Sequence, residues 1–178
     1  MESTFEVRPA TNADAEAVRG VVFAALREHG LTPDPEGTDA DLYDLDSAYA
    51  GTGGSFDVLV DAQGLVVGTV GVSPLGAGRC ELRKMYLAPE LRGRGLGKRL
   101  LLHALERARQ LGFRRVELET ASVLRAAIRL YESFGFRPFA PDHRSAGPGR
   151  ADLAYFLDLG GPGPAEPDDA ADRESKTR

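Results

Sequence analysis

Residues 85–98 constrain this chain more than any other stretch, because they join a strand end, a basic glycine loop and the start of a helix. The run Met-Tyr-Leu at 85–87 favours a strand, and Pro89 has no amide hydrogen to continue a central ladder. Glycine lets the main chain approach a ligand closely, and the free amides and dipole at a helix start favour an anion. The stretch therefore predicts a site for a phosphate-bearing ligand. Its glycines are Gly93, Gly95 and Gly97, and its cations are Arg92, Arg94, Lys98 and Arg99.

Two widespread glycine motifs do not fit this loop. A nucleoside-triphosphate P-loop needs a glycine at position 92 and Ser or Thr at position 99, and both positions hold arginine. A dinucleotide fingerprint needs a third glycine where Lys98 stands. The pattern that does fit is R-x-x-G-x-G, read at Arg92, Gly95 and Gly97. The alternative without a function is an Arg- and Gly-rich surface turn, which the flanking strand and helix disfavour.

A second motif follows one helix and one strand later. It has the form A-x-x-L-Y-x-x-x-G-F, read at Ala127, Leu130, Tyr131, Gly135 and Phe136. Together the two motifs resemble those of the GNAT superfamily of acyl-CoA-dependent N-acyltransferases, in which the glycine loop binds the pyrophosphate of the cofactor. The resemblance covers roughly residues 3–158 and is strongest from 80 to 137.

The resemblance implies an α/β fold with a mixed α+β sheet, in which antiparallel N-terminal strands lead to a parallel pair that splays at the cofactor cleft, flanked by about four helices. The hydrophobic pattern predicts compatible elements. Because a helix joins strand 80–87 to strand 115–120, these two strands are expected to be parallel. The other strands are expected at 5–9, 56–60, 65–72 and 153–157, with a turn at 74–78, and the helices at 13–29, at 39–49, from the glycine loop to Gly112, and from Leu124 to Gly135. One domain is expected over 1–159, followed by a disordered C-terminal tail at 160–178 that lacks an apolar period.

The implied chemistry is direct transfer of an acetyl group from acetyl-CoA, as co-substrate, to a primary amine. The amine must first lose a proton, because an alkylamine titrates near about 10.4. Glu81 is the candidate general base, and Glu119 on the neighbouring strand is the reserve. Side-chain alternation is expected to place Glu81 on the strand face of Met85 and Leu87. The alternative for Glu81 is a surface residue paired with a neighbouring arginine.

Tyr131 is implied as the general acid that returns a proton to the departing CoA thiolate, and its alternative is an ordinary core aromatic. The main chain at 85–87 is expected to pair with the pantetheine arm and to polarise the thioester carbonyl. Leu124 departs from the family pattern, because many members have there an Asn that helps hold the pantetheine arm. The expected cofactor-binding residues are Met85, Tyr86, Leu87, Arg92, Gly93, Arg94, Gly95, Leu96, Gly97 and Lys98.

Composition limits the partners. The net charge of −5 argues against nucleic acid as the main partner and leaves the basic loop to a small anion. No apolar run is long enough to span a membrane and no secretory leader is present, so a cytoplasmic protein that does not bind membranes is expected. Cys80, the only cysteine, is expected to be a small buried side chain, and His103 to be solvated. The histidines have no metal-ligand spacing, so no metal is expected.

The acceptor is expected to be a small-molecule or peptide amine, antibiotics included, and a homodimer is compatible with the sequence. Residues 31–54 and 137–150 are expected to shape the pocket for this acceptor amine. The acidic side chains between residues 34 and 46 suit either a cationic amine or a solvated helix. A different class of function is left open, namely a binding module that senses acyl-CoA without catalysis.

Overall fold

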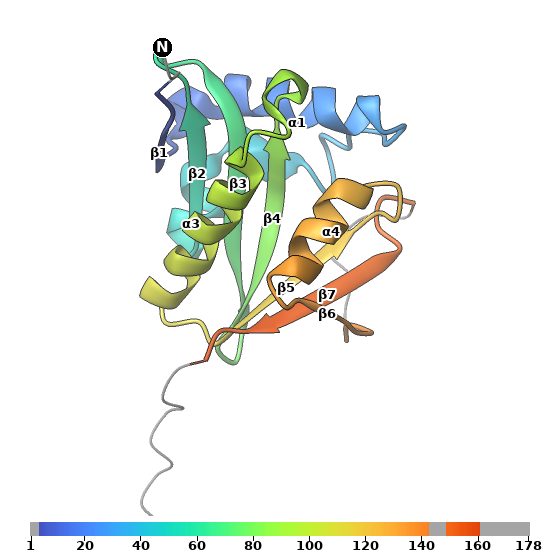
Figure 1. The fold of residues 1–178 in the computed structure, drawn as a ribbon. Helices are drawn as coiled ribbons and strands as arrows, with labels where there is room; N and C mark the ends of the chain where they lie inside the picture. The colour runs from blue at the N-terminus through green and yellow to red at the C-terminus, as the bar shows by residue number, and fades with distance from the viewer. Residues whose placement is uncertain (1–3, 143–148, 161–178) are drawn as a thin grey trace, which may run out of the picture.

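The computed structural model describes residues 4–142 and 149–160. Its strands form a seven-stranded sheet in the order β1-β2-β3-β4-β5-β7-β6, with helices on both faces (Figure 1). The strands are β1 (Glu6–Pro9), β2 (Ser55–Val60), β3 (Val66–Gly76), β4 (Arg79–Leu87), β5 (Arg115–Thr120), β6 (Arg137–Pro138) and β7 (Leu153–Asp158). The helices are α1 (Ala15–Glu28), α2 (Leu45–Ala48), α3 (Leu96–Gln110) and α4 (Arg125–Ser133), with 3-10 turns η1 (Asn12–Asp14), η2 (Ala40–Tyr43), η3 (Ala50–Thr52) and η4 (Pro89–Leu91). The predicted mixed sheet with helices on its flanks is confirmed, and the tail expected at 160–178 lies outside the described residues except for Gly160.

The first four strands form an antiparallel meander, as the sequence predicts. The turn expected at 74–78 is shorter than predicted, because β3 runs through Pro74 and ends at Gly76. Gly76, Ala77 and Gly78 make the turn, and all three have positive φ. Pro74 pairs with Cys80 across the hairpin, so its missing amide hydrogen is tolerated near the end of the ladder.

Two apolar layers cover the sheet. Leu100, Leu101 and Leu105 of α3 pack with Tyr131 of α4 in the core on one face. Val18 and Val22 of α1 pack against strands β2 and β3 in the core on the other face. Every third or fourth residue of α1 and α3 is apolar, which gives each helix one face to bury.

The segment between α1 and β2 is not the continuous helix predicted at 39–49. It consists of η2, the short helix α2 and η3. Asp44 interrupts it with φ −145° and ψ 79°, and its side chain accepts a hydrogen bond from the Ser47 amide at the start of α2. Leu42, Leu45 and Tyr49 are nevertheless buried, so the apolar spacing identified the core residues although the helix is broken.

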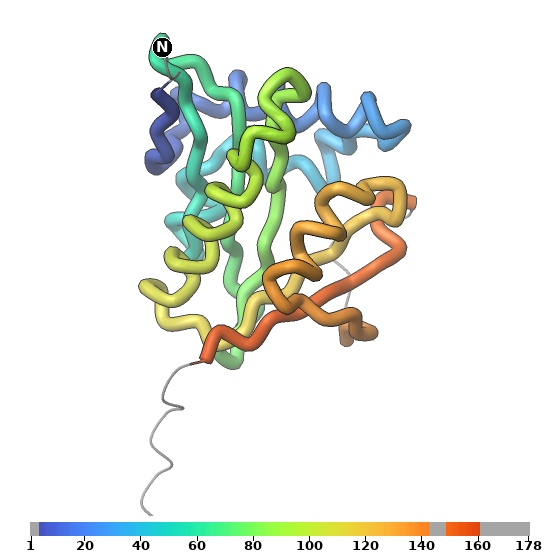
Figure 2. The backbone as a smooth tube through the Cα atoms, viewed as in Figure 1, coloured from blue at the N-terminus to red at the C-terminus, as the bar shows by residue number. Residues whose placement is uncertain are grey.

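Strands β4 and β5 are parallel and splay apart, as expected. They pair only where Arg79–Glu81 face Arg115–Glu117. Beyond these residues the two strands diverge, while β5 pairs along its whole length with β7 on its other side (Figure 2). The sequence did not predict β6, which pairs with β7 through two residues at the sheet edge. No helix in the described ranges is both long and apolar enough to cross a membrane.

Candidate active site

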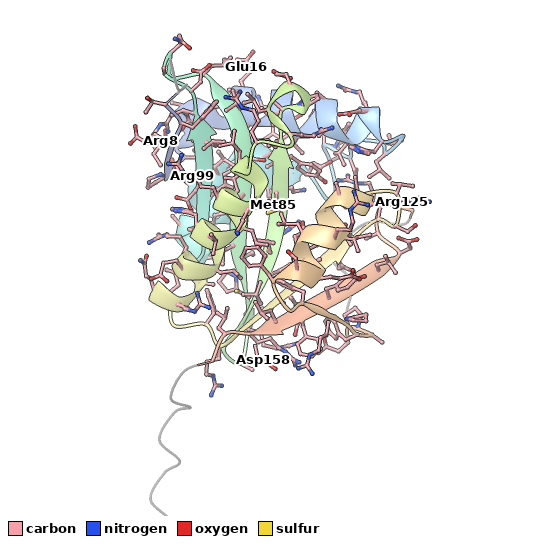
Figure 3. The ribbon with its side chains drawn as sticks, in the orientation of Figure 1. Arg8, Glu16, Met85, Arg99, Arg125 and Asp158 are labelled. Atoms are coloured by element: carbon pink, nitrogen blue, oxygen red, sulfur yellow. The ribbon has the colours of Figure 1, made fainter. Side chains whose placement is uncertain are left out.

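A cavity of about 520 Å3 opens where β4 and β5 diverge. It runs from the glycine loop past the end of β4 to α4 and to the segment before β7. Figure 3 labels Met85 on β4 and Arg125 at the start of α4, and both residues line this cavity. The splayed strands thus give access to residues of both sheet faces at one place. The candidate residues that line the cavity are Glu81, Met85, Tyr86, Leu87, Arg92, Gly93, Gly95, Gly97, Lys98, Glu119 and Tyr131.

The glycine loop has the backbone shape of an anion cradle. Gly93 and Gly95 have φ of 74° and 78°, in the region that favours glycine. The first hydrogen bond within α3 runs from the Arg99 amide to the Gly95 carbonyl, at 3.1 Å. The amides of residues 96–98 therefore precede the helical ladder, as the first amides of any helix do. Lys98 makes no ion pair with another described residue.

Two of the expected cofactor-binding residues do not line the cavity. Leu96 is buried in the core beneath α3. The Arg94 guanidinium lies 5.3 Å from the centre of the Phe5 ring. Arg92 does line the cavity, but it also forms a bidentate ion pair with Glu28 at the end of α1, with N–O distances of 2.6 and 2.9 Å. This hydrogen bond from Arg92 lowers the pKa of Glu28.

A β-bulge interrupts β4 just before the open part of the strand. Thr69 pairs with Tyr86 whereas Gly71 pairs with Arg83, so two residues of β4 lie opposite one residue of β3. The first of these two residues is Lys84, whose φ of 52° is rare for a residue that has a side chain.

The bulge changes which side chains share a face. Glu81 pairs with Ser73 of β3 and lies on the face of Tyr86, towards α1, whereas Leu87 packs in the core under α3. The expectation that Glu81 shares the face of Met85 and Leu87 is therefore wrong, because simple alternation does not continue through a bulge.

The three candidate proton-transfer residues reach the cavity from different elements. Glu81 comes from β4 and is buried, with its Oε2 3.6 Å from the Arg83 Nε. Glu119 comes from β5, and Tyr131 comes from α4. Tyr131 is buried and its ring lies 5.7 Å from the Phe136 ring, so it is both a core aromatic and a cavity residue. Burial raises the pKa of the Tyr131 hydroxyl, which keeps it protonated and able to donate.

The sequence did not identify a group of buried and half-buried charges beside the bulge, here called the Asp39 cluster: Asp39, Asp41, Arg83, Lys84 and Arg150. Asp39 is fully buried, and Arg83, Lys84 and Arg150 line the cavity. One signal was present in the sequence, because adjacent charges at 83 and 84 in a central strand cannot both face water. The partners from residues 39–41 and from residue 150 are far away in the chain, and no local pattern predicts them.

Four of the six acidic side chains between residues 34 and 46 make contacts that support the fold. Asp39 pairs with Lys84 and Arg150, and the Tyr49 hydroxyl donates a hydrogen bond to Asp41. Asp34 accepts from the Thr38 amide, and Asp44 caps α2. None of the six acidic side chains in this segment is among the residues that line the cavity.

Two other expectations can be compared with the structure. Cys80 is buried as expected, and burial together with nearby Glu117 and Glu81 raises the pKa of its thiol to about 12. A thiol of this kind is a poor nucleophile at neutral pH. His103 is not simply solvated, because its Nε2 lies 3.4 Å from Oδ1 of buried Asp57. The His103 imidazole on α3 therefore lies over the buried Asp57 carboxylate.

The chain is similar in sequence to known acetyltransferases. A model of the acetyltransferase (GNAT) family matches residues 23–136. The uncharacterized N-acetyltransferase YjgM of Escherichia coli (strain K12) is 43% identical over 135 residues, which are 73% of this chain and 80% of that protein.

Solved structures share the fold. A GNAT-family acetyltransferase of Staphylococcus aureus Mu50 superposes with a TM-score of 0.80 at 21% identity, covering 88% of this chain and 100% of that chain. YncA of Salmonella typhimurium, whose structure contains its cofactor acetyl-CoA, gives a TM-score of 0.68 at 24% identity, covering 88% of this chain and 94% of that chain.

Proposed function

The chain belongs to the acetyltransferase (GNAT) family, and we propose that it moves an acetyl group from acetyl-CoA directly to a primary amine. The family is the one that the two sequence motifs resemble. N-acetyltransferase relatives and a structural neighbour that contains acetyl-CoA support this choice of donor. The proposal specifies the acceptor only by its chemical class, a primary amine.

The observation that carries the proposal is the continuity of the cavity. A single space of about 520 Å3 joins the glycine loop, the open part of β4, both candidate bases and Tyr131. A nucleotide thioester needs an anion site at one end and proton-transfer groups at the other, with an extended channel between them. The lining of the cavity includes residues suited to each of these roles.

The glycine loop fits a diphosphate. A Cβ added at Gly93 or Gly95 would meet no atom within 4 Å, so the space beside the loop is open. The main-chain amides of residues 93–98 would bind the diphosphate oxygens, and Lys98 would supply a positive charge. Arg92 would contribute to the same positive field from its position against Glu28.

The open part of β4 supplies the donor channel and the oxyanion site. Because β5 leaves β4 after Glu81, the β4 edge at residues 85–87 faces the cavity instead of a neighbouring strand. An extended pantetheine arm would pair with this edge as an added strand does. A β4 amide would then donate to the thioester carbonyl and stabilise the oxygen as it becomes negative.

Glu81 and Tyr131 would manage the protons. Glu81 is placed on the α1 side of the sheet, where Leu31, Thr38 and Arg150 form the wall that remains for an acceptor. From there it would take the amine proton, directly or through water, with Glu119 as the alternative base. Tyr131 lies on the α4 side and would return a proton to the CoA sulfur as the carbon–sulfur bond breaks. The amine nitrogen thereby gains the acetyl carbon and loses a proton.

A screen of amines with acetyl-CoA, measured by the release of free thiol, tests the proposal. Polyamines, amino acids, aminoglycosides and peptides cover the chemical range of acceptors. We expect at least one class to give thiol release that depends on both substrates, and mass spectrometry to show an amine heavier by one acetyl group. Binding of acetyl-CoA without turnover across all four classes would favour the sensing module instead.

A further inference from the structure

The bulge in β4 is held in place by contacts that the proposed chemistry does not use. The Thr69 hydroxyl donates a hydrogen bond of 2.6 Å to the Lys84 carbonyl. The Lys84 ammonium is buried, donates to the Thr38 carbonyl at 2.8 Å and forms an ion pair with Asp39. Asp41 lies 3.5 Å from the same ammonium. The unusual backbone of Lys84 is therefore fixed at both its main chain and its side chain.

Asp39 connects this bulge to two further segments. Its Oδ2 accepts a hydrogen bond from the Asp34 amide at 2.8 Å and another from Arg150 at 2.8 Å. Arg150 leads into β7, and Asp34 belongs to the loop after α1. Burial alone would raise the pKa of Asp39, but the hydrogen bonds from Arg150, the Asp34 amide and Lys84 lower it to about 2.

These contacts lie directly before the part of β4 whose main chain would bind the acyl group. Lys84 immediately precedes the open edge at 85–87, so a change of its φ would rotate the amides that face the cavity. A residue with a side chain adopts positive φ only when its surroundings compel it. Asp39 and Lys84 supply such surroundings from inside the protein.

We propose that Asp39 is a positioning residue: through Lys84 it fixes the bulge that aims the β4 main chain at the acyl group, and through Arg150 it ties the acceptor wall to the same point. The inference rests on the proposed function for its catalytic consequence. It does not make Asp39 a catalytic residue, because Asp39 is not among the residues that line the cavity.

The kinetic test compares three variants with a matched control. Lys84→Met removes the ammonium and keeps a side chain at positive φ, whereas Lys84→Gly removes the ammonium but adopts that φ without strain. We expect Lys84→Met and Asp39→Asn to lower kcat by about tenfold or more, and Lys84→Gly to recover most of that loss. Asp46→Asn, an exposed aspartate of the same segment, should match the wild type. The glycine loop is untouched, so only the pantetheine contacts of CoA at 85–87 should weaken, and the fall in kcat in Lys84→Met and Asp39→Asn should exceed the rise in the Kd for CoA.

A second measurement does not depend on turnover. Hydrogen exchange of the amides at 85–87 should be faster in Lys84→Met and Asp39→Asn than in the wild type, and close to the wild type in Lys84→Gly. If the wild type acetylates no amine, the proposed function fails while the exchange pattern still tests the bulge. Wild-type exchange in Lys84→Met, or Lys84→Gly as impaired as Lys84→Met, would overturn the positioning role. Asp39→Asn keeps the size of the side chain, so it tests the role even if Lys84→Met does not fold.

Discussion

A substitution at Gly97 can separate an effect on CoA binding from an effect on folding. A Cβ at this position would lie 3.7 Å from the Leu130 side chain, an ordinary contact, and the residue does not have positive φ. Gly97→Val should therefore leave the melting temperature nearly unchanged and weaken CoA binding by at least about tenfold, because the side chain fills the cradle. Calorimetric titration with CoA and a thermal melt measure the two quantities.

Gly20→Val is the matched control for that prediction. Gly20 lies on the exposed face of α1, and a Cβ there would meet no atom within 4 Å. Its CoA affinity should equal that of the wild type. Gly95 is a poorer choice for the test, because its φ of 78° would strain any side chain and mix a folding loss with a binding loss. Equal CoA affinity in Gly97→Val and Gly20→Val would contradict the loop assignment.

Tyr131 gives a prediction about pH. Its raised pKa means that the hydroxyl stays protonated up to at least pH 10, so Tyr131 should cause no fall in kcat between pH 7 and about 10. Tyr131→Phe should lower kcat by roughly 100-fold at all these pH values, with a small change in the Kd for CoA. Tyr43→Phe, at an exposed tyrosine, is the control. Steady-state rates from pH 7 to 10 measure the effect. A Tyr131→Phe variant as active as the wild type and Tyr43→Phe would reject the proposed role of Tyr131.

At the scale of elements, the pair between Glu28 and Arg92 joins α1 to the glycine loop. Both side chains are more than a third exposed, so the pair adds little to stability. Glu28→Gln should leave the melting temperature almost unchanged. It should also tighten CoA binding severalfold at low salt, because it removes a negative charge beside an anion site and releases Arg92. Titrations in low and high salt measure the effect, and weaker binding in the variant would mean that Glu28 instead holds Arg92 in a productive position.

The Asp39 cluster predicts how stability depends on pH. Asp39 has a folded pKa of about 2, below the unfolded value of about 3.9, so its stabilising effect is complete above about pH 4 and is lost as pH falls towards 2. Asp39→Ala should cost about 3 kcal/mol at pH 7, because Lys84 and Arg150 would lose a buried partner. Urea denaturation of both proteins should show a constant difference from pH 7 to 5 that narrows below pH 4. A difference that grows on acidification would have the wrong sign.

At the scale of the whole molecule, a CoA ligand would bridge two parts of the sheet that meet through only three pairs of residues in β4 and β5. Saturation at about 100 times Kd should add about 2.7 kcal/mol to the free energy of unfolding. For a chain of this length that is a rise in melting temperature of about 5–11 °C. Thermal melts with CoA and with pantetheine, which lacks the diphosphate, measure it. An equal rise with both ligands would mean that the glycine loop contributes nothing.

Much of the fold follows from local signals in the sequence. The glycines, Pro89 and the alternation of β2 and β3 are read within a few residues, and so the predicted strands and the loop agree with the structure. The interruption at Asp44 was missed because apolar spacing reports burial and not helical continuity. The insertion of β7 between β5 and β6 was missed because strand order depends on contacts between distant segments.

In the candidate site, too, some residues could be predicted from local motifs and others could not. Residues 92–98 and Tyr131 belong to compact motifs, whereas Asp39, Lys84 and Arg150 come together only in the folded chain. The bulge also shows why a strand pattern cannot be extended without limit, since a single extra residue moved Glu81 to the face opposite Leu87.

The walls of the cavity have an implication for engineering. In the proposed function, the half of the cavity that would hold the donor is built mainly from two continuous segments, 85–98 and 119–131. The wall on the α1 side takes Leu26, Leu31 and Thr38 from early in the chain and Arg150 and Ala151 from late in it. If this wall selects the acceptor as proposed, a library that randomises only its early or only its late residues would vary just part of the acceptor surface. Paired libraries, recombined across the unchanged middle of the gene, would keep the proposed CoA-binding residues while both parts of the proposed acceptor wall vary.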